Sequence, residues 1–357
     1  MPTKRAAAVA AAGALCLLTA ACGGPSHDGR SEAAPPSPAS GGGYPVTLTN
    51  CGMTETFDKA PSRVVVMNGA SVAEVSTLLA LGLGDRIVAN EQTYGMSEVA
   101  GRAEAIKDLP TGGVTLNDAY DVPREAMIGL RPDLVLSDSA YGFDAKNGFA
   151  TRQQLRDVHA DSYISPQGCD QDGSKMTVED SYTLLRDMGR IFDVGERADA
   201  VIAASRKRIA AVRQKVGNTG KPKVMVVFSN MVMGSNAFSS VAAHGIYNDI
   251  LAKAGGANAF ASATPNSFAD LSKEQVAAAD VDALVVISYN DPHATAYAQQ
   301  ILKEFPQWPA ARKHACTVLS DSMYLGPDND VAVDRIARML HPDRFPGASA
   351  SPWRRSS

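Results

Sequence analysis

The chain is poor in cysteine, in aromatic side chains and in excess charge of either sign. Its 357 residues include five Cys and 6% aromatics, and 34 Lys and Arg stand against 38 Asp and Glu, a net charge of −4. So few cysteines exclude a small disulfide-rich scaffold, and the weakly negative charge argues against nucleic acid as a partner. A hydrophobic content of 45% excludes a disordered chain, and the length predicts two globular units.

The sequence also lacks the motifs of common enzymes and metal sites. It contains no Gly-x-Ser-x-Gly, His-Glu-x-x-His or P-loop, and Gly82-Leu83-Gly84 follows a predicted helix instead of opening one. Its six histidines show no paired spacing, which a metal site would need. We therefore expect no enzymatic activity, no catalytic residue, no protein-ligated metal and no permanent cofactor.

Residues 1–21 have the pattern of a bacterial lipoprotein signal peptide. Lys4 and Arg5 precede an apolar run that is too short to span a membrane, and small residues lead up to Cys22. This end resembles a lipobox, which implies diacylglyceryl and palmitate attachment at Cys22 and a place on the extracytoplasmic face of the cell membrane. A secreted protein that is cut nearby is the alternative. Residues 22–44 are rich in Gly, Pro and Ser, which predicts a flexible tether.

Three cysteines remain after such processing, and they allow one disulfide. Cys51 and Cys169 both precede the chain midpoint and flank strand-like segments, so we pair them. Cys316 lies in an apolar run and is expected to be a buried thiol. A metal site or a catalytic cysteine is the less favoured alternative, because no second Cys or His is near in sequence.

The rest of the chain alternates short aliphatic strands with helical patterns, which is typical of parallel α/β layers. Two such series occupy residues 45–195 and 218–346, and each is expected to form a lobe with a mostly parallel sheet. Strands are expected at 63–67, 86–89, 134–136, 163–164, 223–228, 283–287 and 316–319.

Between the two series, a helix free of Gly and Pro over Glu196–Val216 is expected within residues 196–217, as a rigid strut or as an ordinary amphipathic surface helix. Ser71 and Glu74 are expected to form a capping box at the first helix of the body. Residues 347–357 are expected to be a disordered tail.

Several segments, taken in order, resemble the class III substrate-binding proteins of bacterial importers for ferric siderophores and cobalamin. They are Ala60–Val65, Ala80–Val88, Leu130–Val135, Gly255–Phe260 and Leu271–Val276. The resemblance implies two Rossmann-like lobes joined by one long helix, a small-molecule chelate in the cleft, small closure, and an ABC permease with its ATPase as partners. Asn50-Cys51-Gly52, with a second cysteine after Tyr163–Pro166, resembles a lipoprotein subgroup. We expect a monomer.

The resemblance also places two permease-docking glutamates, at Glu125 and Glu274. Both are expected in the first turn of a helix, where a carboxylate also stabilises the helix dipole by about 0.3–1 kcal/mol, so this simpler role stays open. The family often has a further Glu where this chain has Ser76.

Residues that follow the strands are the candidate ligand contacts, because ligands of open α/β sheets bind beyond the carboxyl ends of the strands. These loops are rich in aromatic and amide side chains, and any one of them is equally a packed or exposed loop residue. The candidates are Asn68, Tyr94, Tyr141, Asn230, His244, Tyr289 and Tyr324.

The same loops are short of Lys and Arg, which would recognise an anionic catecholate. The first lobe supplies only Arg102, Lys146 and Arg152 in longer loops, and we hypothesise that Asp138 and Asp321 favour a cationic chelate. The expected ligand is a ferric siderophore of the hydroxamate type.

A corrinoid or heme is the alternative ligand, and Tyr289 or His244 is then a candidate axial ligand of heme. A surface lipoprotein that senses a ligand through a membrane partner is the alternative function.

Overall fold

The computed structural model describes residues 43–346 apart from 94–96, 167, 170–172 and 232. The expected signal peptide, Cys22, nearly all of the tether and the tail over 347–357 therefore lie outside the described residues. Among the helices within the described part, none is long and apolar enough to cross a membrane.

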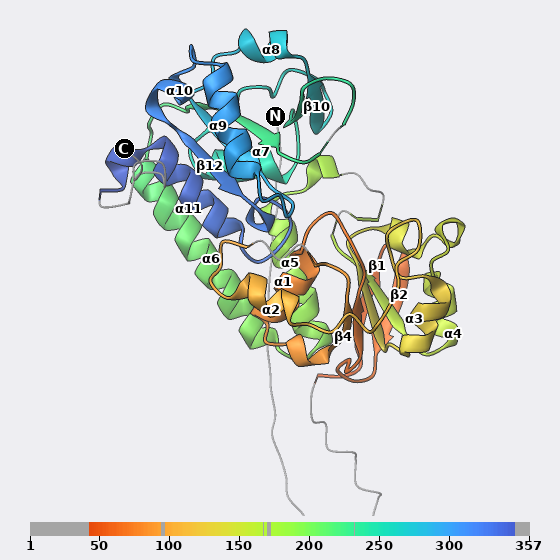
Figure 1. Cartoon of the computed structure of the whole chain (residues 1–357). Helices are drawn as coiled ribbons and strands as arrows, with labels where there is room; N and C mark the ends of the chain where they lie inside the picture. Colours follow the sequence, from red (N-terminus) through yellow and green to blue (C-terminus); the bar gives the residue numbers. More distant parts are fainter. Residues whose placement is uncertain (1–42, 94–96, 167, 170–172, 232, 347–357) are drawn as a thin grey trace, which may run out of the picture. The chain divides into compact units, whose positions relative to one another are not determined.

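The first lobe, called the N-lobe here, is built on a four-stranded parallel sheet with the order β4-β3-β5-β6 (Figure 1). Its strands are β3 (Val64–Val66), β4 (Ile87–Asn90), β5 (Leu134–Ser137) and β6 (Asp161–Ile164). Its helices are α1 (Ala73–Ala80), α2 (Arg102–Lys107), α3 (Arg124–Leu130) and α4 (Arg152–Asp157). The four strands expected in this series are present, and β3 and β5 are buried throughout because the central strands of a parallel sheet are covered on both faces.

An antiparallel hairpin that the sequence analysis did not anticipate lies against the β6 side of this sheet. It consists of β1 (Val46–Asn50) and β2 (Met53–Phe57). The Asn50 side chain donates to the Ile164 carbonyl and accepts from its N–H, at 2.7 and 2.8 Å. Glu55, 1% exposed, accepts from the Arg152 guanidinium at 2.9 Å. These contacts fix the hairpin by buried polar bonds.

A disulfide joins Cys51, in the turn of this hairpin, to Cys169, and these are the two cysteines that the sequence analysis pairs. Cys316 is a buried free thiol, and burial raises its pKa to about 11. Such a thiol is protonated at neutral pH and is therefore a poor nucleophile.

The second lobe, called the C-lobe here, is built on a mixed sheet with the order β10-β8-β7-β11-β12, with β9 paired to β7. Strands β7, β9, β11 and β12 run parallel, whereas β8 and β10 form an antiparallel edge. The strands are β7 (Lys223–Phe228), β8 (Phe238–Val241), β9 (Ala257–Asn258), β10 (Phe268–Leu271), β11 (Ala283–Ile287) and β12 (Cys316–Leu319). The helices are α7 (Ile246–Lys253), α8 (Lys273–Ala277), α9 (Ala294–Glu304), α10 (Pro309–Lys313) and α11 (Asn329–Leu340).

Two helices connect the lobes. Helix α5 (Val178–Ile191) leads into α6 (Gly195–Val216), the long helix that the sequence predicts, and α11 packs alongside α6 (Figure 1). The largest hydrophobic cluster contains side chains of both lobes and of these connecting helices. The lobes therefore share a core, which favours small relative movements over a wide opening.

The expected capping box at α1 is not formed. The N-cap of α1 is Val72, without a side-chain bond, and the Ser71 hydroxyl accepts from the Ala73 N–H at 3.2 Å. Glu74 instead turns inward, is 1% exposed, and accepts hydrogen bonds from Gln92 and Ser165. A buried carboxylate gains more from two side-chain donors than from one exposed backbone N–H.

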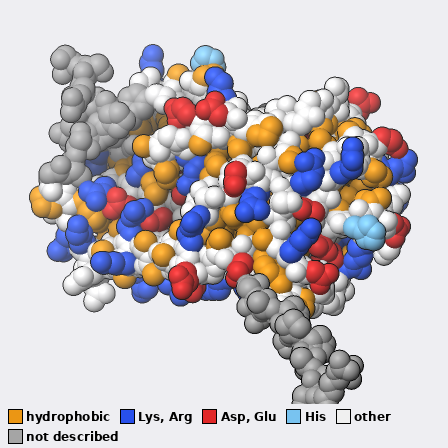
Figure 2. Space-filling view, turned by 90° about the horizontal axis from the view of Figure 1, so that it is seen from below, with side chains coloured by type: hydrophobic (Ala, Val, Ile, Leu, Met, Phe, Trp, Pro, Cys, Tyr) orange, Lys and Arg blue, Asp and Glu red, His pale blue; other side chains and the backbone are white. Residues whose placement is uncertain are grey.

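The surface carries charges of both signs. On the face that Figure 2 shows, Lys and Arg side chains are interspersed with Asp and Glu side chains. This mixture agrees with the small net charge of the chain.

Candidate ligand-binding site

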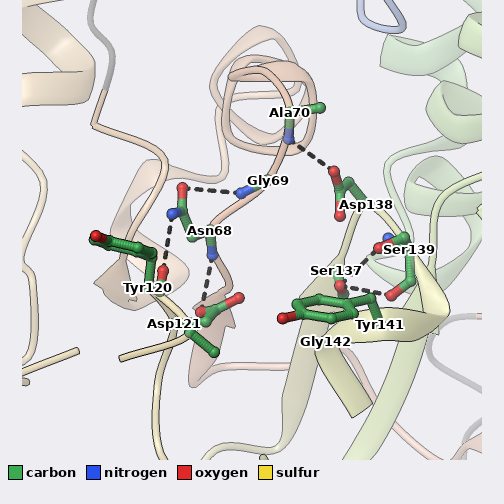
Figure 3. A pocket seen from close by; sticks show the side chains of 11 residues that line it. Asn68, Gly69, Ala70, Tyr120, Asp121, Ser137, Asp138, Ser139, Tyr141 and Gly142 are labelled. Carbon is green, nitrogen blue, oxygen red and sulfur yellow. Dashed lines mark hydrogen bonds between the residues drawn. The ribbon is translucent and has the colours of Figure 1, made fainter. Parts of the chain in front are cut away.

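A pocket of about 270 Å³ opens where three segments of the N-lobe meet (Figure 3). Two of them directly follow β3 and β5, the central strands of the sheet, and the third precedes α3. We call this the N-lobe pocket. Its lining residues are Asn68, Gly69, Ala70, Ala119, Tyr120, Asp121, Ser137, Asp138, Ser139, Tyr141 and Gly142. The pocket thus lies at the carboxyl ends of parallel strands, where open α/β sheets bind their ligands.

Asp121 holds two walls of the pocket together. Its Oδ1 accepts from the Asn68 N–H at 3.1 Å and from the Val122 N–H at 2.8 Å, and the Asn68 side chain donates to the Tyr120 carbonyl at 2.9 Å. Both bonds to Asp121 use Oδ1, so Oδ2 has no hydrogen-bond partner among the described residues. Asp121 is 6% exposed, and Figure 3 shows it between Tyr120 and Tyr141.

Asp138 forms the corresponding link from the segment after β5. Its Oδ2 accepts from the Ala70 N–H at 2.8 Å. A Cβ on Gly69 would lie 2.9 Å from the Asp138 carboxyl carbon, so a larger residue there would press on this carboxylate. The Asn68–Ala70 segment is therefore held from both sides by aspartates.

Burial raises the pKa values of the carboxylates in and near the pocket. Burial, and then the neighbouring Asp138, raise the pKa of Asp121 to about 6 against the lowering effect of its two backbone donors. Burial also raises the pKa of Asp138. Glu91 directly follows β4, and burial together with the charge of Asp121 raises its pKa to about 7. Its Oε1 is buried without a hydrogen-bond partner in the described part of the chain.

The basic residues of the N-lobe do not compensate these charges. None of the lining residues that the structure describes is Lys, Arg or His. Arg102 instead pairs with Asp328 at 3.5 Å, Arg152 is buried against Glu55, and Lys146 is exposed in the loop after β5. The pocket is therefore negative wherever its aspartates are ionised.

The C-lobe contributes five packed aromatic side chains, which we call the C-lobe aromatic cluster: Phe228, Tyr247, Phe268, Tyr289 and Tyr324. The Tyr247 and Tyr289 hydroxyls are 2.9 Å apart. Burial first, then Tyr289, Asp138 and Glu74, raise the pKa of Tyr324 above its usual value. Asp138 and Glu74 belong to the N-lobe, so the charge of this lobe reaches Tyr324 of the C-lobe.

The structure brings together only some of the residues that the sequence suggested. Asn68 and Tyr141 line the N-lobe pocket, and Tyr289 and Tyr324 belong to the C-lobe aromatic cluster. Asn230 donates to the Tyr289 carbonyl at 2.6 Å.

Two further candidates stand apart from this group. His244 is exposed and does not line the pocket. Tyr94 lies outside the described residues.

Asp321, which we hypothesised to favour a cationic chelate together with Asp138, does not line the N-lobe pocket. Asp321 is 4% exposed, accepts from the Ser76 hydroxyl at 3.2 Å and is not among the residues that line the pocket. Glu98 reaches the same place from the N-lobe and accepts from the Ser320 N–H and the Ser322 hydroxyl at 2.8 and 2.6 Å. Asp321 is therefore part of the contact between the lobes.

Sequence reasoning missed Tyr120 and Asp121 as pocket residues. They precede α3 instead of following a strand, so the rule about strand ends does not find them. Tyr120 has a positive φ of 60° and its side chain is 75% exposed. The available signal in the sequence was an aromatic residue shortly before a helix start.

Glu125 and Glu274 are both exposed and lie in the first turns of α3 and α8. Glu125 pairs with its neighbour Arg124 at 2.6 Å, and this arginine lowers the pKa of Glu125. At α8 Ser272 and Gln275 form a capping box. The backbone at Glu274 and then the Ser272 side chain lower the pKa of Glu274 by hydrogen bonding. Both carboxylates are accessible to a partner.

Several carboxylates lie in or near the pocket, and carboxylates can bind metal ions. Within the described ranges, no group of three or more His, Cys, Asp or Glu side chains is arranged to hold a metal ion.

Two α/β lobes with a pocket at the strand ends define a protein that binds small molecules. The model of the periplasmic binding protein family matches residues 64–322, more than half of the chain, and the chain belongs to this family. Proteins of the family deliver substrates to ABC importers and are not enzymes.

Solved structures of similar fold cover most of the chain. An ABC-type Fe³⁺-hydroxamate transport protein of Saccharomonospora viridis is 26% identical with a TM-score of 0.64, over 83% of this chain and 99% of that one. A periplasmic heme-binding protein of Roseiflexus is 24% identical with a TM-score of 0.58, over 79% and 99%. A Helicobacter pylori protein with Ni(II) bound is 15% identical with a TM-score of 0.59, over 84% and 90%. The last two similarities show the fold alone.

Proposed function

We propose that this protein is the lipid-anchored, extracytoplasmic substrate-binding component of an ABC importer and that it captures a ferric siderophore of the hydroxamate type. The observation that carries the ligand class is the N-lobe pocket, which combines Asp121, Asp138 and tyrosines without a basic residue among its described lining. Three hydroxamates neutralise Fe³⁺, so such a chelate needs no Arg or Lys for recognition, whereas a tris-catecholate is strongly anionic. The iron is held by the chelator, and the protein binds the organic surface.

The Saccharomonospora protein supports this ligand class, because it is named for ferric hydroxamate transport. The shared core of the two lobes supports a receptor that closes modestly around its ligand.

Heme is the second candidate ligand. Tyrosine is one of the side chains that ligate heme iron, and Tyr120 and Tyr141 are 75% and 44% exposed beside the pocket. Of the axial ligands expected from the sequence, Tyr289 shares a hydrogen bond with Tyr247 and His244 lies on the surface. Tyr141 is therefore the better candidate.

A titration of the purified protein separates these ligands. Ferric trihydroxamates, a ferric catecholate, cobalamin and heme are each added while heat of binding and tyrosine fluorescence are recorded. Saturable submicromolar binding of a hydroxamate alone supports the proposal. Binding of heme alone, with a tyrosinate absorption band that Tyr141→Phe removes, replaces hydroxamate by heme. A lack of binding to all four favours the ligand-sensing alternative.

The proposed docking role of Glu125 and Glu274 requires a second assay, with the importer reconstituted in membranes. The variants Glu125→Gln and Glu274→Gln, alone and together, are expected to lower the stimulation of the importer's ATPase while leaving ligand affinity unchanged. Glu196→Gln, an exposed glutamate at the start of α6, is the matched control. If the double variant stimulates the importer's ATPase fully, neither glutamate is needed for docking, and both act only by stabilising their helix dipoles.

The lipid anchor at Cys22 is tested independently of the ligand. Intact mass spectrometry of the membrane-extracted protein is expected to show an N-terminal Cys22 that carries diacylglycerol and palmitate. A soluble secreted form with an unmodified N-terminus would contradict the anchor.

A further inference from the structure

The N-lobe pocket is too small for a whole chelate. Its volume of about 270 Å³ lies below the roughly 300–1,000 Å³ of pockets that enclose entire small ligands. A ferric trihydroxamate would therefore leave its bulky iron-containing body outside and insert only a side arm. The chemistry of that arm is set by the groups that line the pocket.

Those groups are suited to a cation. Asp121 is buried and lines the pocket, and its Oδ2 has no hydrogen-bond partner in the part of the chain that the structure describes. Asp138 lines the opposite wall, on the other side of the Asn68–Ala70 segment. Tyr120 and Tyr141 lie on either side of Asp121, and ring faces attract ammonium groups.

The negative charge near the pocket is also uncompensated. Glu91 adds a third carboxylate, with one buried oxygen that lacks a partner among the described residues. Arg102 forms an ion pair with Asp328, and Arg152 forms one with Glu55. A bound cation would supply the opposite charge that the described lining lacks.

We propose that the N-lobe pocket is a subsite for a positively charged, alkylammonium-type arm of the ligand, held by Asp121 and Asp138. The inference rests on the proposed function for the identity of the ligand's body, but the subsite itself follows from the pocket. A neutral arm would leave the aspartates uncompensated, and an anionic arm would be repelled by them.

Three ferric trihydroxamates with the same iron-binding core test this subsite. Ferrioxamine B carries a pendant pentylammonium arm, N-acetylation makes that arm neutral, and N-succinylation makes it anionic. In calorimetric titrations of the purified protein we expect ferrioxamine B to bind at least about tenfold more tightly than the acetylated form, and the succinylated form to bind most weakly. Equal affinities would overturn the subsite and leave the hydroxamate function intact.

The variants Asp121→Asn and Asp138→Asn assign the effect to the pocket. The Asn oxygen still accepts the backbone N–H groups of Asn68, Val122 or Ala70, so the walls keep their hydrogen bonds while the charge is removed. Each variant is expected to reduce the difference in affinity between ferrioxamine B and its acetylated form. Asp118→Asn, an exposed residue of the same loop outside the lining, is the matched control and is expected to leave this difference unchanged.

A fragment separates the subsite from the proposed function. Pentylammonium and the neutral 1-pentanol are titrated at millimolar concentration, and the amide NMR signals of Asn68, Ala70 and Val122 are followed. Shifts with pentylammonium alone support the subsite, even if no ferrioxamine binds and the hydroxamate proposal fails. Identical responses to both fragments, or no response to either, would overturn the subsite.

Discussion

The two lobes share a layered α/β plan but are stabilised by different means. The N-lobe fixes its added hairpin with a disulfide and buried polar bonds, among them the pair between Glu55 and Arg152. Both lobes bury large rings, but the cysteine of the C-lobe, Cys316, is a free thiol, and its Trp308, 1% exposed, stacks on Phe305 with their centroids 4.5 Å apart.

The two lobes also differ in the groups that they offer to a ligand. The N-lobe presents carboxylates and backbone groups at the pocket, whereas the C-lobe presents an aromatic cluster. Hydrogen bonds are directional, so they fix the positions of charged groups. Packing between aromatic rings depends less on the direction of approach, and it forms a stable apolar surface. The N-lobe is therefore expected to determine which ligand charge is accepted, and the C-lobe to bury the ligand's apolar surface.

The largest expected effect comes from removing a ring of the C-lobe. Trp308→Ala is expected to lower the free energy of unfolding by about 3–5 kcal/mol, because it leaves a large cavity in the apolar core. Urea denaturation followed by circular dichroism measures it. Tyr120→Ala, at an exposed N-lobe ring, serves as control with an expected change below about 0.5 kcal/mol. A small cost for Trp308→Ala would break the contrast between the lobes.

The next effect belongs to the N-lobe. Replacement of both Cys51 and Cys169 by Ala removes a crosslink between residues 118 apart in sequence, and is expected to cost about 2–4 kcal/mol by releasing chain entropy in the unfolded state. Urea denaturation under non-reducing conditions measures the loss. Cys316→Ala, at the buried free thiol of the C-lobe, is the control and is expected to cost about 1 kcal/mol. A double variant as stable as the native protein would show that polar bonds alone hold the hairpin.

The pocket carboxylates make the N-lobe sensitive to pH. The pKa of the Asp121 carboxyl is about 6 in the folded protein and 3.8 for a free aspartate side chain, which represents the unfolded chain. Between these two pH values the folded state binds more protons than the unfolded state. The folded protein therefore loses stability as pH rises from about 4 to about 6. Asp121→Asn is therefore expected to be about 3 kcal/mol more stable than the native protein at pH 7.5, with the difference vanishing near pH 4. Urea denaturation across this range measures it, and a pH-independent difference would contradict the cause.

The smallest effect refines the description of the C-lobe aromatic cluster. Tyr247→Phe keeps the ring and removes the hydroxyl that bonds to Tyr289, so a cost of about 1 kcal/mol or less is expected in thermal unfolding. The paired variant Tyr247→Leu removes the ring as well and is expected to cost more. Equal costs for the two variants would mean that the hydrogen bond, and not ring packing, stabilises the cluster.

The sequence predicted the parallel strands and the long helix because hydrophobic runs and a stretch without Gly and Pro are local signals. It did not predict the hairpin of β1 and β2 or the antiparallel edge of β8 and β10, whose pairing depends on contacts with distant segments. Glu74 shows the same limit, because its local pattern favours a cap whereas Gln92 and Ser165 offer it buried donors.

The site was predicted in part for the same reason. Asn68 and Tyr141 follow strands that the sequence reveals, so the rule about strand ends finds them. Asp121 reaches the pocket from a loop before a helix, and Asp321 is bonded to Ser76 of the N-lobe where the two lobes meet. Sequence spacing contains neither fact.

We expect the ligand to lie between the carboxylates of the N-lobe pocket and the C-lobe aromatic cluster. Anomalous diffraction at the iron edge, from crystals of the protein grown with ferrioxamine B, locates the metal directly. We predict one iron peak outside the N-lobe pocket, with the ammonium arm leading from it to Asp121 and Asp138. An iron peak on another face of the protein, or an arm that points away from both aspartates, would contradict it.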